Sequence, residues 1–142
     1  MKGAISMWWS ISTLSRTEKE TVTKHRIGQG LFKELLLNKY GCKCALCTIT
    51  TEKMLIGSHI KEWSSSSDEE KLDVNNGLLL CAHHDALFDK HLISFDNDGK
   101  VIVSPTLTVQ EKAELQIDAI SDISVSPEML PYLEVHRSKL RR

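Results

Sequence analysis

The sequence predicts a small α+β domain in which a bound metal ion joins distant parts of the chain. Three observations support this fold class: apolar residues at helical spacing between residues 28 and 39, a β-hairpin pattern at 93–103, and two short pairs of metal-ligand residues between 44 and 84. The 142 residues suffice for one domain with a modest aliphatic core. Such a core gains stability from a structural metal ion.

The first 25 residues are poorly patterned, so we expect residues 1–25 to be an N-terminal extension or linker and residues 26–142 to be the domain. The polar run at 15–20 fits either a linker or the start of a helix. Beyond it, the spacing of apolar residues predicts a helix over Gly28–Lys39, with Gly41 as its C-terminal stop. The apolar residues at helical spacing are Leu31, Phe32, Leu35, Leu36 and Tyr40.

The middle of the chain predicts two strands followed by a helix. Met54–Ile60 fits a strand, Gly77–Leu80 is a short buried run, and Ala82–Asp89 fits a helix. The serine-rich stretch at 64–71 is expected to be an exposed loop without assignable chemistry. The pattern is therefore strand, long loop, strand and helix.

The last third begins with the strongest hairpin signal in the chain. Ile93–Phe95 and Lys100–Val103 are joined by Asp96-Asn97-Asp98-Gly99, a turn sequence typical of hairpins. A short helix is expected over Thr108–Leu115, and Ser126-Pro127-Glu128 predicts a further helix start.

The net charge of −1 does not by itself indicate a nucleic-acid partner. Its distribution is more informative, because basic residues gather before the metal-ligand region and at the end of the chain, and a phosphate backbone responds to such local faces. These residues are Lys24, His25, Arg26, Lys33, Lys39, Lys43, Arg137, Lys139, Arg141 and Arg142.

Cysteine spacing predicts a reducing, cytoplasmic setting rather than a disulfide-bonded secreted protein. The chain has four cysteines, and two of them form a Cys-x-x-Cys pair. The first residues lack the long apolar region of a signal peptide, and no apolar run is long enough to span a membrane, so we expect no membrane partner.

Two pairs, Cys44-x-x-Cys47 and Cys81-x-x-His84, predict one structural zinc ion. Each short turn directs two side chains to one point, and two such turns supply the four ligands of a tetrahedral site with no open position. Two alternatives remain open at this stage: Cys42 could replace Cys44, and His83 could replace His84.

His59, Asn76 and Asp85 are the candidate catalytic residues. His59 ends the first predicted strand, Asn76 precedes the second, and Asp85 follows the second metal pair, so a zinc ion would bring them together. Phosphodiester hydrolysis needs a base such as histidine and a divalent ion such as Mg²⁺, for which a carboxylate is a suitable ligand. This set predicts a metal-dependent nuclease.

The chain also resembles the HNH nucleases, particularly a branch found in restriction-type endonucleases. The resemblance covers about residues 26–137. Its carriers are R-x-G-Q-x-x-F at 26–32, Y-x-x-x-C-x-x-C at 40–47, S-H-I at 58–60, N-G-L-L-L at 76–80, H-D-A-L-F-D at 84–89, F-D-x-D-G at 95–99 and Y-L-E-x-H-R at 132–137.

This resemblance implies a ββα-metal (His-Me finger) nuclease core with flanking helices and an extra β-hairpin. It implies DNA hydrolysis leaving 5′-phosphate ends, with His59 as general base and Asp85 with Asn76 holding Mg²⁺ or Mn²⁺. Arg26, Gln29 and Lys61 are candidate nucleic-acid contacts, and a homodimer is a further expectation.

Two departures from the family pattern bear on activity. Ser58 stands where many members have an aspartate ligand, and Asp85 stands where the third motif position is usually histidine. Since Asp85 can still bind a divalent ion, activity survives in principle. The alternative function is a catalytically inactive, zinc-containing nucleic-acid-binding module.

Overall fold

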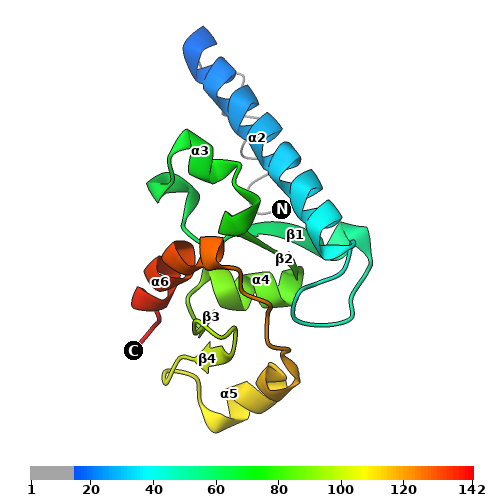
Figure 1. Ribbon diagram of the computed structural model, residues 1–142, viewed down its shortest axis with the longest axis vertical. Coiled ribbons are helices and arrows are strands. Elements are labelled where there is room, and N and C mark those ends of the chain that lie inside the picture. Colours follow the sequence, from blue (N-terminus) through cyan, green and yellow to red (C-terminus); the bar gives the residue numbers. More distant parts are fainter. Residues whose placement is uncertain (1–14) are drawn as a thin grey trace.

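The protein is described from a computed structural model in which residues 15–142 are placed. Residues 1–14, most of the expected N-terminal extension, lie outside the described residues. Figure 1 shows a central unit of β1, β2 and α4, with α2 crossing above it and β3, β4, α5 and α6 around its lower side. The helices and strands are α2 (Arg16–Tyr40), β1 (Leu55–His59), α3 (Asp68–Lys71), β2 (Gly77–Cys81), α4 (Ala82–Asp89), β3 (Ile93–Phe95), β4 (Val101–Val103), α5 (Val109–Glu114) and α6 (Leu130–Ser138), with short 3-10 turns between them.

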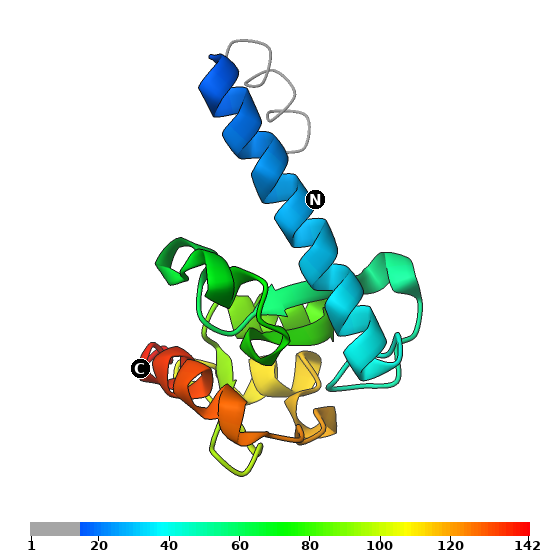
Figure 2. The same cartoon turned by 45° about the horizontal axis from the view of Figure 1, so that its top comes forward.

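The predicted helix at 28–39 is the C-terminal half of α2, which has 25 residues. The helix begins earlier than expected because the Ser15 side chain caps it, accepting a hydrogen bond from the backbone N–H of Glu18 at 3.2 Å. It ends at Gly41, which has a left-handed φ of 62°. The predicted boundary after residue 25 therefore lies inside a continuous helix, whose N-terminal half projects from the domain (Figure 2).

Two antiparallel two-stranded sheets form, as the sequence predicted. β1 pairs with β2 in a register that sets His59 opposite Gly77, and β3 pairs with β4 with Ile93 opposite Val103. Every residue of β2 is buried, because α2 and α4 both pack against the β1–β2 hairpin. The observed α+β architecture, two strands followed directly by a helix, is the predicted fold class.

The prediction of an exposed loop over residues 64–71 was wrong in part. This stretch contains the short helix α3, which begins with a capping box between Ser67 and Glu70. The sequence did contain this signal, since a serine three residues before a glutamate is the pattern of a capping box. The segment has a role in the functional site described below.

The C-terminal helix α6 is held by the buried His136. Its Nε2 donates to the backbone carbonyl of Phe88 at 2.8 Å, and its Nδ1 accepts from the Ser94 hydroxyl at 2.8 Å. The ring also stacks on that of Phe88 at 3.8 Å. Burial is the main reason that the pKa of His136 is lowered to about 4, so the ring stays neutral near pH 7.

We predict that His136 makes the domain less stable in mild acid. Its pKa is lower in the folded state than the usual 6.5, so its contribution is complete above pH 6.5 and declines as the pH falls toward 4. Between pH 7.5 and 5.5, the free energy of unfolding of the wild type should fall by about 1 kcal/mol more than that of His136→Gln, which has no titrating ring. Urea unfolding at both pH values measures this difference, and equal losses in the two proteins would contradict the prediction.

Candidate active site and metal centre

Four predicted ligands form one cluster at the base of the β1–β2 hairpin. Cys44 and Cys47 lie on the loop after α2, and Cys81 and His84 lie where β2 meets α4. Their ligand atoms all lie within 4.8 Å of one another. The Cys47 and Cys81 sulfurs are 3.9 Å apart, and His84 Nδ1 is 3.3 Å from the Cys81 sulfur. A tetrahedral ion with Zn–S bonds of about 2.3 Å separates its sulfurs by about 3.8 Å, so the cluster has the dimensions of a zinc site.

The surroundings of Cys44 favour a thiolate. Its sulfur accepts backbone hydrogen bonds from Cys81 at 3.2 Å and Leu46 at 3.4 Å. Burial acts to raise its pKa, but the contact with His84 and these backbone bonds outweigh it and lower the pKa to about 6. Burial raises the pKa of Cys47 to about 11. Because a buried thiolate needs a compensating positive charge, the cluster fits a metal cation.

The structure separates the two alternative ligands from this cluster. Cys42 is exposed and has a left-handed φ of 55°. The His83 Nε2 lies 2.9 Å from the backbone carbonyl of Leu115. Neither side chain belongs to the group, whereas Cys44 and His84 both do.

A second site is a cavity of about 320 Å³ beside the outer edge of β1. Five consecutive residues, from Ile56 to Ile60, line it. Successive side chains of a strand point to opposite faces, but a cavity that runs along the edge of the strand can border all of them. The cavity brings together His59 and Asp85, which were predicted to converge, and Gln29 joins them from α2. The complete lining is Gln29, Ile56, Gly57, Ser58, His59, Ile60, Glu62, Trp63, Asp85, Asp89, His91 and His136.

The His59 ring is fixed on two sides. It stacks on Phe32 of α2 with ring centroids 3.7 Å apart, and its Nε2 lies 2.8 Å from the backbone carbonyl of Lys71 in α3. A carbonyl only accepts, so Nε2 carries the proton and Nδ1 keeps its lone pair. Burial is the main cause that lowers the pKa of His59 below 6.5, which keeps the ring neutral near pH 7. The His59 ring is therefore neutral, and its Nδ1 carries no proton.

Asp85 lies in the first turn of α4 and lines the cavity together with Ser58. Burial raises the pKa of Asp85; the Ser58 side chain opposes this effect, and the neighbouring Asp89 carboxylate adds to it. Within residues 15–142 the cysteine cluster is the only group of three or more potential ligands close enough to hold an ion. An ion at Asp85 would thus take other ligands from water or a substrate phosphate, as Mg²⁺ commonly does.

Asn76 is fully buried and does not line the cavity. Its Oδ1 accepts from the Lys61 backbone N–H at 2.8 Å, and its Nδ2 donates to the Glu70 carbonyl at 3.0 Å and toward the Ser66 hydroxyl at 3.4 Å. These bonds hold the loop whose Lys71 carbonyl orients His59. The Asn76 amide is thus engaged within this loop, and the structure does not bring it to the predicted ion.

The three candidate nucleic-acid contacts lie in different surroundings. Gln29 lines the cavity, and Arg26 is exposed one turn earlier on α2. The Lys61 ammonium lies 3.0 Å from a carboxylate oxygen of Glu70 and is held in this ion pair.

Several residues of the cavity were not identified from the sequence. His91 is the most unusual, because it is a buried non-glycine residue with a left-handed φ of 58°. Its Nε2 has no hydrogen-bond partner and lies 3.8 Å from a Glu62 carboxylate oxygen. Trp63 contacts the edges of the His25 and His59 rings and lies under the Lys71 ammonium. No spacing rule in the sequence points to these long-range contacts.

The fold and the two sites define a unit of two strands and a helix. The unit has a cluster of zinc-type ligands, and one cavity in it is lined by both an imidazole and a carboxylate. Residues 44–96, which include β1, β2, α4 and both sites' principal residues, match the family profile described as HNH endonuclease. The match confirms the resemblance inferred from the sequence motifs over this segment. No curated protein matches the chain significantly. None of the helices within residues 15–142 combines the length and apolar character of a membrane-spanning helix.

We predict that Cys44→Ser loses bound zinc whereas Cys42→Ser keeps one ion per chain. Cys44 is buried in the cluster and Cys42 is exposed outside it, so the pair controls for loss of a thiol as such. Cys44→Ser should also lower the free energy of unfolding by more than about 3 kcal/mol, since structural zinc contributes directly to folding. Atomic emission and urea unfolding measure both effects. Zinc loss in Cys42→Ser, or retention in Cys44→Ser, would contradict the assignment.

We predict that Gly77→Ala disturbs the support of His59. A Cβ at Gly77 would lie 2.4 Å from the Phe32 ring, which stacks on His59, and 3.0 Å from Leu36. The forced repacking should cost about 1–3 kcal/mol of stability. Gly30→Ala is the matched control, because no atom lies within 4 Å of its added Cβ and alanine favours the helix. Urea unfolding compares them, and wild-type stability in Gly77→Ala would refute the expectation.

Proposed function

We propose that this domain is a metal-dependent DNA endonuclease of the HNH type that hydrolyses phosphodiester bonds. The principal support is the cavity beside β1, which is lined by both a neutral imidazole held by a hydrogen bond and a half-buried carboxylate. The family match over residues 44–96 supports the same reaction class.

In the proposed reaction His59 is the general base. Its Nδ1 takes a proton from water, which then attacks the phosphorus, while its Nε2 keeps its hydrogen bond to the Lys71 carbonyl. That bond stabilises the imidazolium that forms, because the carbonyl accepts from a now positively charged ring. The stack on Phe32 keeps the ring from turning away.

Asp85 is the proposed anchor of a divalent ion, Mg²⁺ or Mn²⁺. When bound, the ion supplies stabilisation of the negative charge that develops on the phosphate and on the leaving 3′-oxygen. Asp85 is held at the cavity by its place in the first turn of α4. Breaking the bond between the phosphorus and this 3′-oxygen leaves 5′-phosphate and 3′-hydroxyl ends.

The proposed zinc ion of Cys44, Cys47, Cys81 and His84 is structural. Four protein ligands leave it no open position for water or substrate. Because His84 and Asp85 are consecutive, binding at the cluster also positions the catalytic carboxylate. We further propose that the domain serves as the catalytic part of a restriction-type enzyme and that Arg26 and Gln29 contact the DNA beside the cavity.

One alternative function is a zinc-containing nucleic-acid-binding module without catalysis. Two observations favour it: Ser58 cannot act as a carboxylate ligand, and the buried Asn76 uses its amide for the loop. Both functions require DNA binding that weakens with salt, so cleavage distinguishes them.

We predict that the protein nicks supercoiled plasmid in the presence of Mg²⁺ or Mn²⁺ and that His59→Ala reduces the rate at least about 100-fold, the usual effect of losing a general base. His83→Ala is the matched control, since His83 lies outside the cavity and points to Leu115. Asp85→Ala should likewise reduce cleavage at every concentration of the divalent ion.

Zinc content measured for every variant shows whether the cluster is intact. Equal cleavage by wild type and His59→Ala would remove His59 from its role. No cleavage by the zinc-loaded wild type with either ion, together with salt-sensitive DNA binding, would favour the binding module.

A further inference from the structure

The middle of α2 carries a stripe of exposed apolar side chains. Ile27 is 57%, Leu31 52% and Leu35 45% exposed. The described side chains of the projecting segment before it, from Arg16 to Arg26, are polar and exposed. Large apolar side chains gathered in this way on a surface mark an interaction site.

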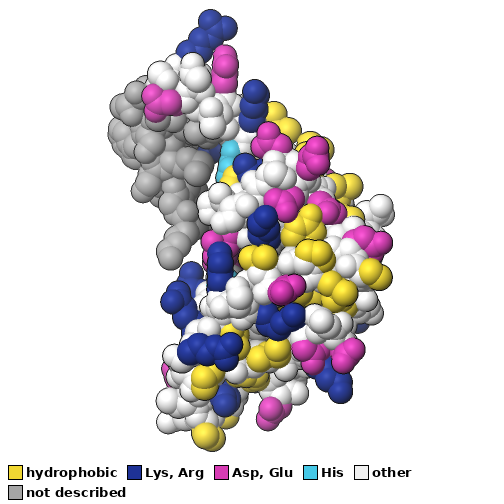
Figure 3. Space-filling model, turned by 60° about the vertical axis from the view of Figure 1, so that its left-hand side comes forward, with side chains coloured by type: hydrophobic (Ala, Val, Ile, Leu, Met, Phe, Trp, Pro, Cys, Tyr) yellow, Lys and Arg dark blue, Asp and Glu magenta, His cyan; other side chains and the backbone are white. Residues whose placement is uncertain are grey.

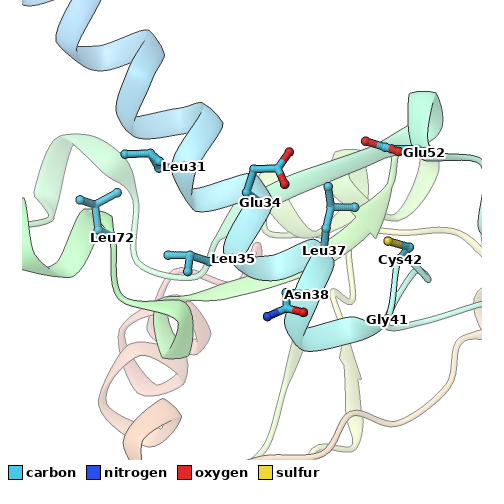
Figure 4. A pocket seen from close by; sticks show the side chains of 9 residues that line it. All are labelled: Leu31, Glu34, Leu35, Leu37, Asn38, Gly41, Cys42, Glu52 and Leu72. Atoms are coloured by element: carbon cyan, nitrogen blue, oxygen red, sulfur yellow. The ribbon is translucent and has the colours of Figure 1, made fainter.

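A groove lies beside this stripe, between α2 and the loops that follow it. It has a volume of about 910 Å³ and is lined by Leu31, Leu35 and Leu72 with Glu34 and Asn38 along one side. Figure 4 shows Leu31 and Leu35 extending from α2 toward the side on which Leu72 lies. Figure 3 shows exposed hydrophobic side chains in a patch below the projecting end of the molecule, with acidic side chains among them.

The exposed face of α2 carries a seam with alternating spacings of four and three residues. This spacing places side chains along one line of a helix that packs against another helix. The seam consists of Glu20, Lys24, Ile27, Leu31, Glu34 and Asn38, all of them exposed. Its two apolar residues stand at the centre, flanked by one basic and one acidic residue.

This order is self-complementary for two antiparallel helices. If the pair is centred between Ile27 and Leu31, Ile27 packs against the partner's Leu31, and Lys24 faces the partner's Glu34. The symmetry repeats both contacts, which gives an apolar centre with an ion pair on each side. Neither Lys24 nor Glu34 forms an ion pair elsewhere within residues 15–142.

The same arrangement brings a segment of the partner to the groove. In an antiparallel pair, the projecting N-terminal half of one helix runs beside the C-terminal half of the other, where Leu35 and Leu72 lie. Each copy thus supplies one projecting segment and one groove, as an isologous interface requires. A helical segment of this length has little stability alone in water, so the contact also accounts for the exposed half of α2.

We infer that two copies of this chain associate through antiparallel α2 helices, in the register that joins Lys24 to the partner's Glu34. Gln29, which lines the cavity, lies two positions from both Ile27 and Leu31 and hence on the opposite side of the helix. The interface therefore leaves both cavities open. The inference does not depend on the proposed nuclease activity.

Charge reversal tests the register directly. Sedimentation equilibrium of the 142-residue chain at tens of micromolar should give twice the 16.0 kDa mass of one chain. Lys24→Glu and Glu34→Lys should each raise the dissociation constant about tenfold, because each converts two attractions into two repulsions. The double variant restores both ion pairs with reversed sign and should return to the wild-type dissociation constant.

Ile27→Asp should raise the dissociation constant at least about 100-fold. Val109→Asp is its control, because Val109 is 85% exposed on α5, away from the seam, and should leave the dimer intact. Zinc content and far-ultraviolet circular dichroism establish that each variant is folded. A monomeric wild type, a dimer insensitive to Ile27→Asp, or a double charge variant weaker than the single ones would each overturn the inference.

Discussion

The joint between β2 and α4 is the constraint on which the two sites depend. Cys81 ends the strand and Ala82 begins the helix, with no residue between them. The cluster requires Cys81 and His84 to face the Cys44–Cys47 loop, and this requirement fixes the direction in which α4 leaves the sheet. Asp85 comes next in the chain, so the same joint sets the carboxylate beside Ser58 at the edge of β1. The proposed zinc ion would therefore contribute to the cavity only by fixing where Asp85 lies.

Two imidazoles, a half-buried one at His59 and a buried one at His136, show how similar surroundings permit different roles. His59 and His136 each stack on a phenylalanine, each lie 2.8 Å from a backbone carbonyl through Nε2, and each have a pKa lowered mainly by burial. The difference lies at Nδ1. In His136 this atom accepts from Ser94, so both nitrogens are used to hold α6. In His59 the described residues provide no hydrogen bond to Nδ1, and the ring borders a cavity. The Nδ1 lone pair of His59 is therefore left to accept a proton in the proposed reaction.

The features that could be predicted from the sequence were set by neighbouring residues. The ligand pairs, the hairpin beginning at Ile93 and the helix after Cys81 each carry their signal within a few positions. The convergence of His59 and Asp85 was also predicted, because the ligand pairs tie their segments together. The Lys71 carbonyl could not be predicted, since any residue supplies a carbonyl and only packing selects this one. The early start of α2 stayed one of two alternatives for a related reason: an exposed helix has no buried stripe to reveal it.

The loop between β1 and β2 is closed at its base, because His59 and Gly77 are paired across the hairpin. Lys71, whose carbonyl orients His59, and Asn76 lie in the second half of this loop, whereas Ser64 and Ser65 are exposed in its first half. Lengthening a loop whose ends are already fixed costs little, about 0.6 kcal/mol for each doubling. Residues inserted beside these exposed serines would therefore cost the fold little and leave the surroundings of His59 in place.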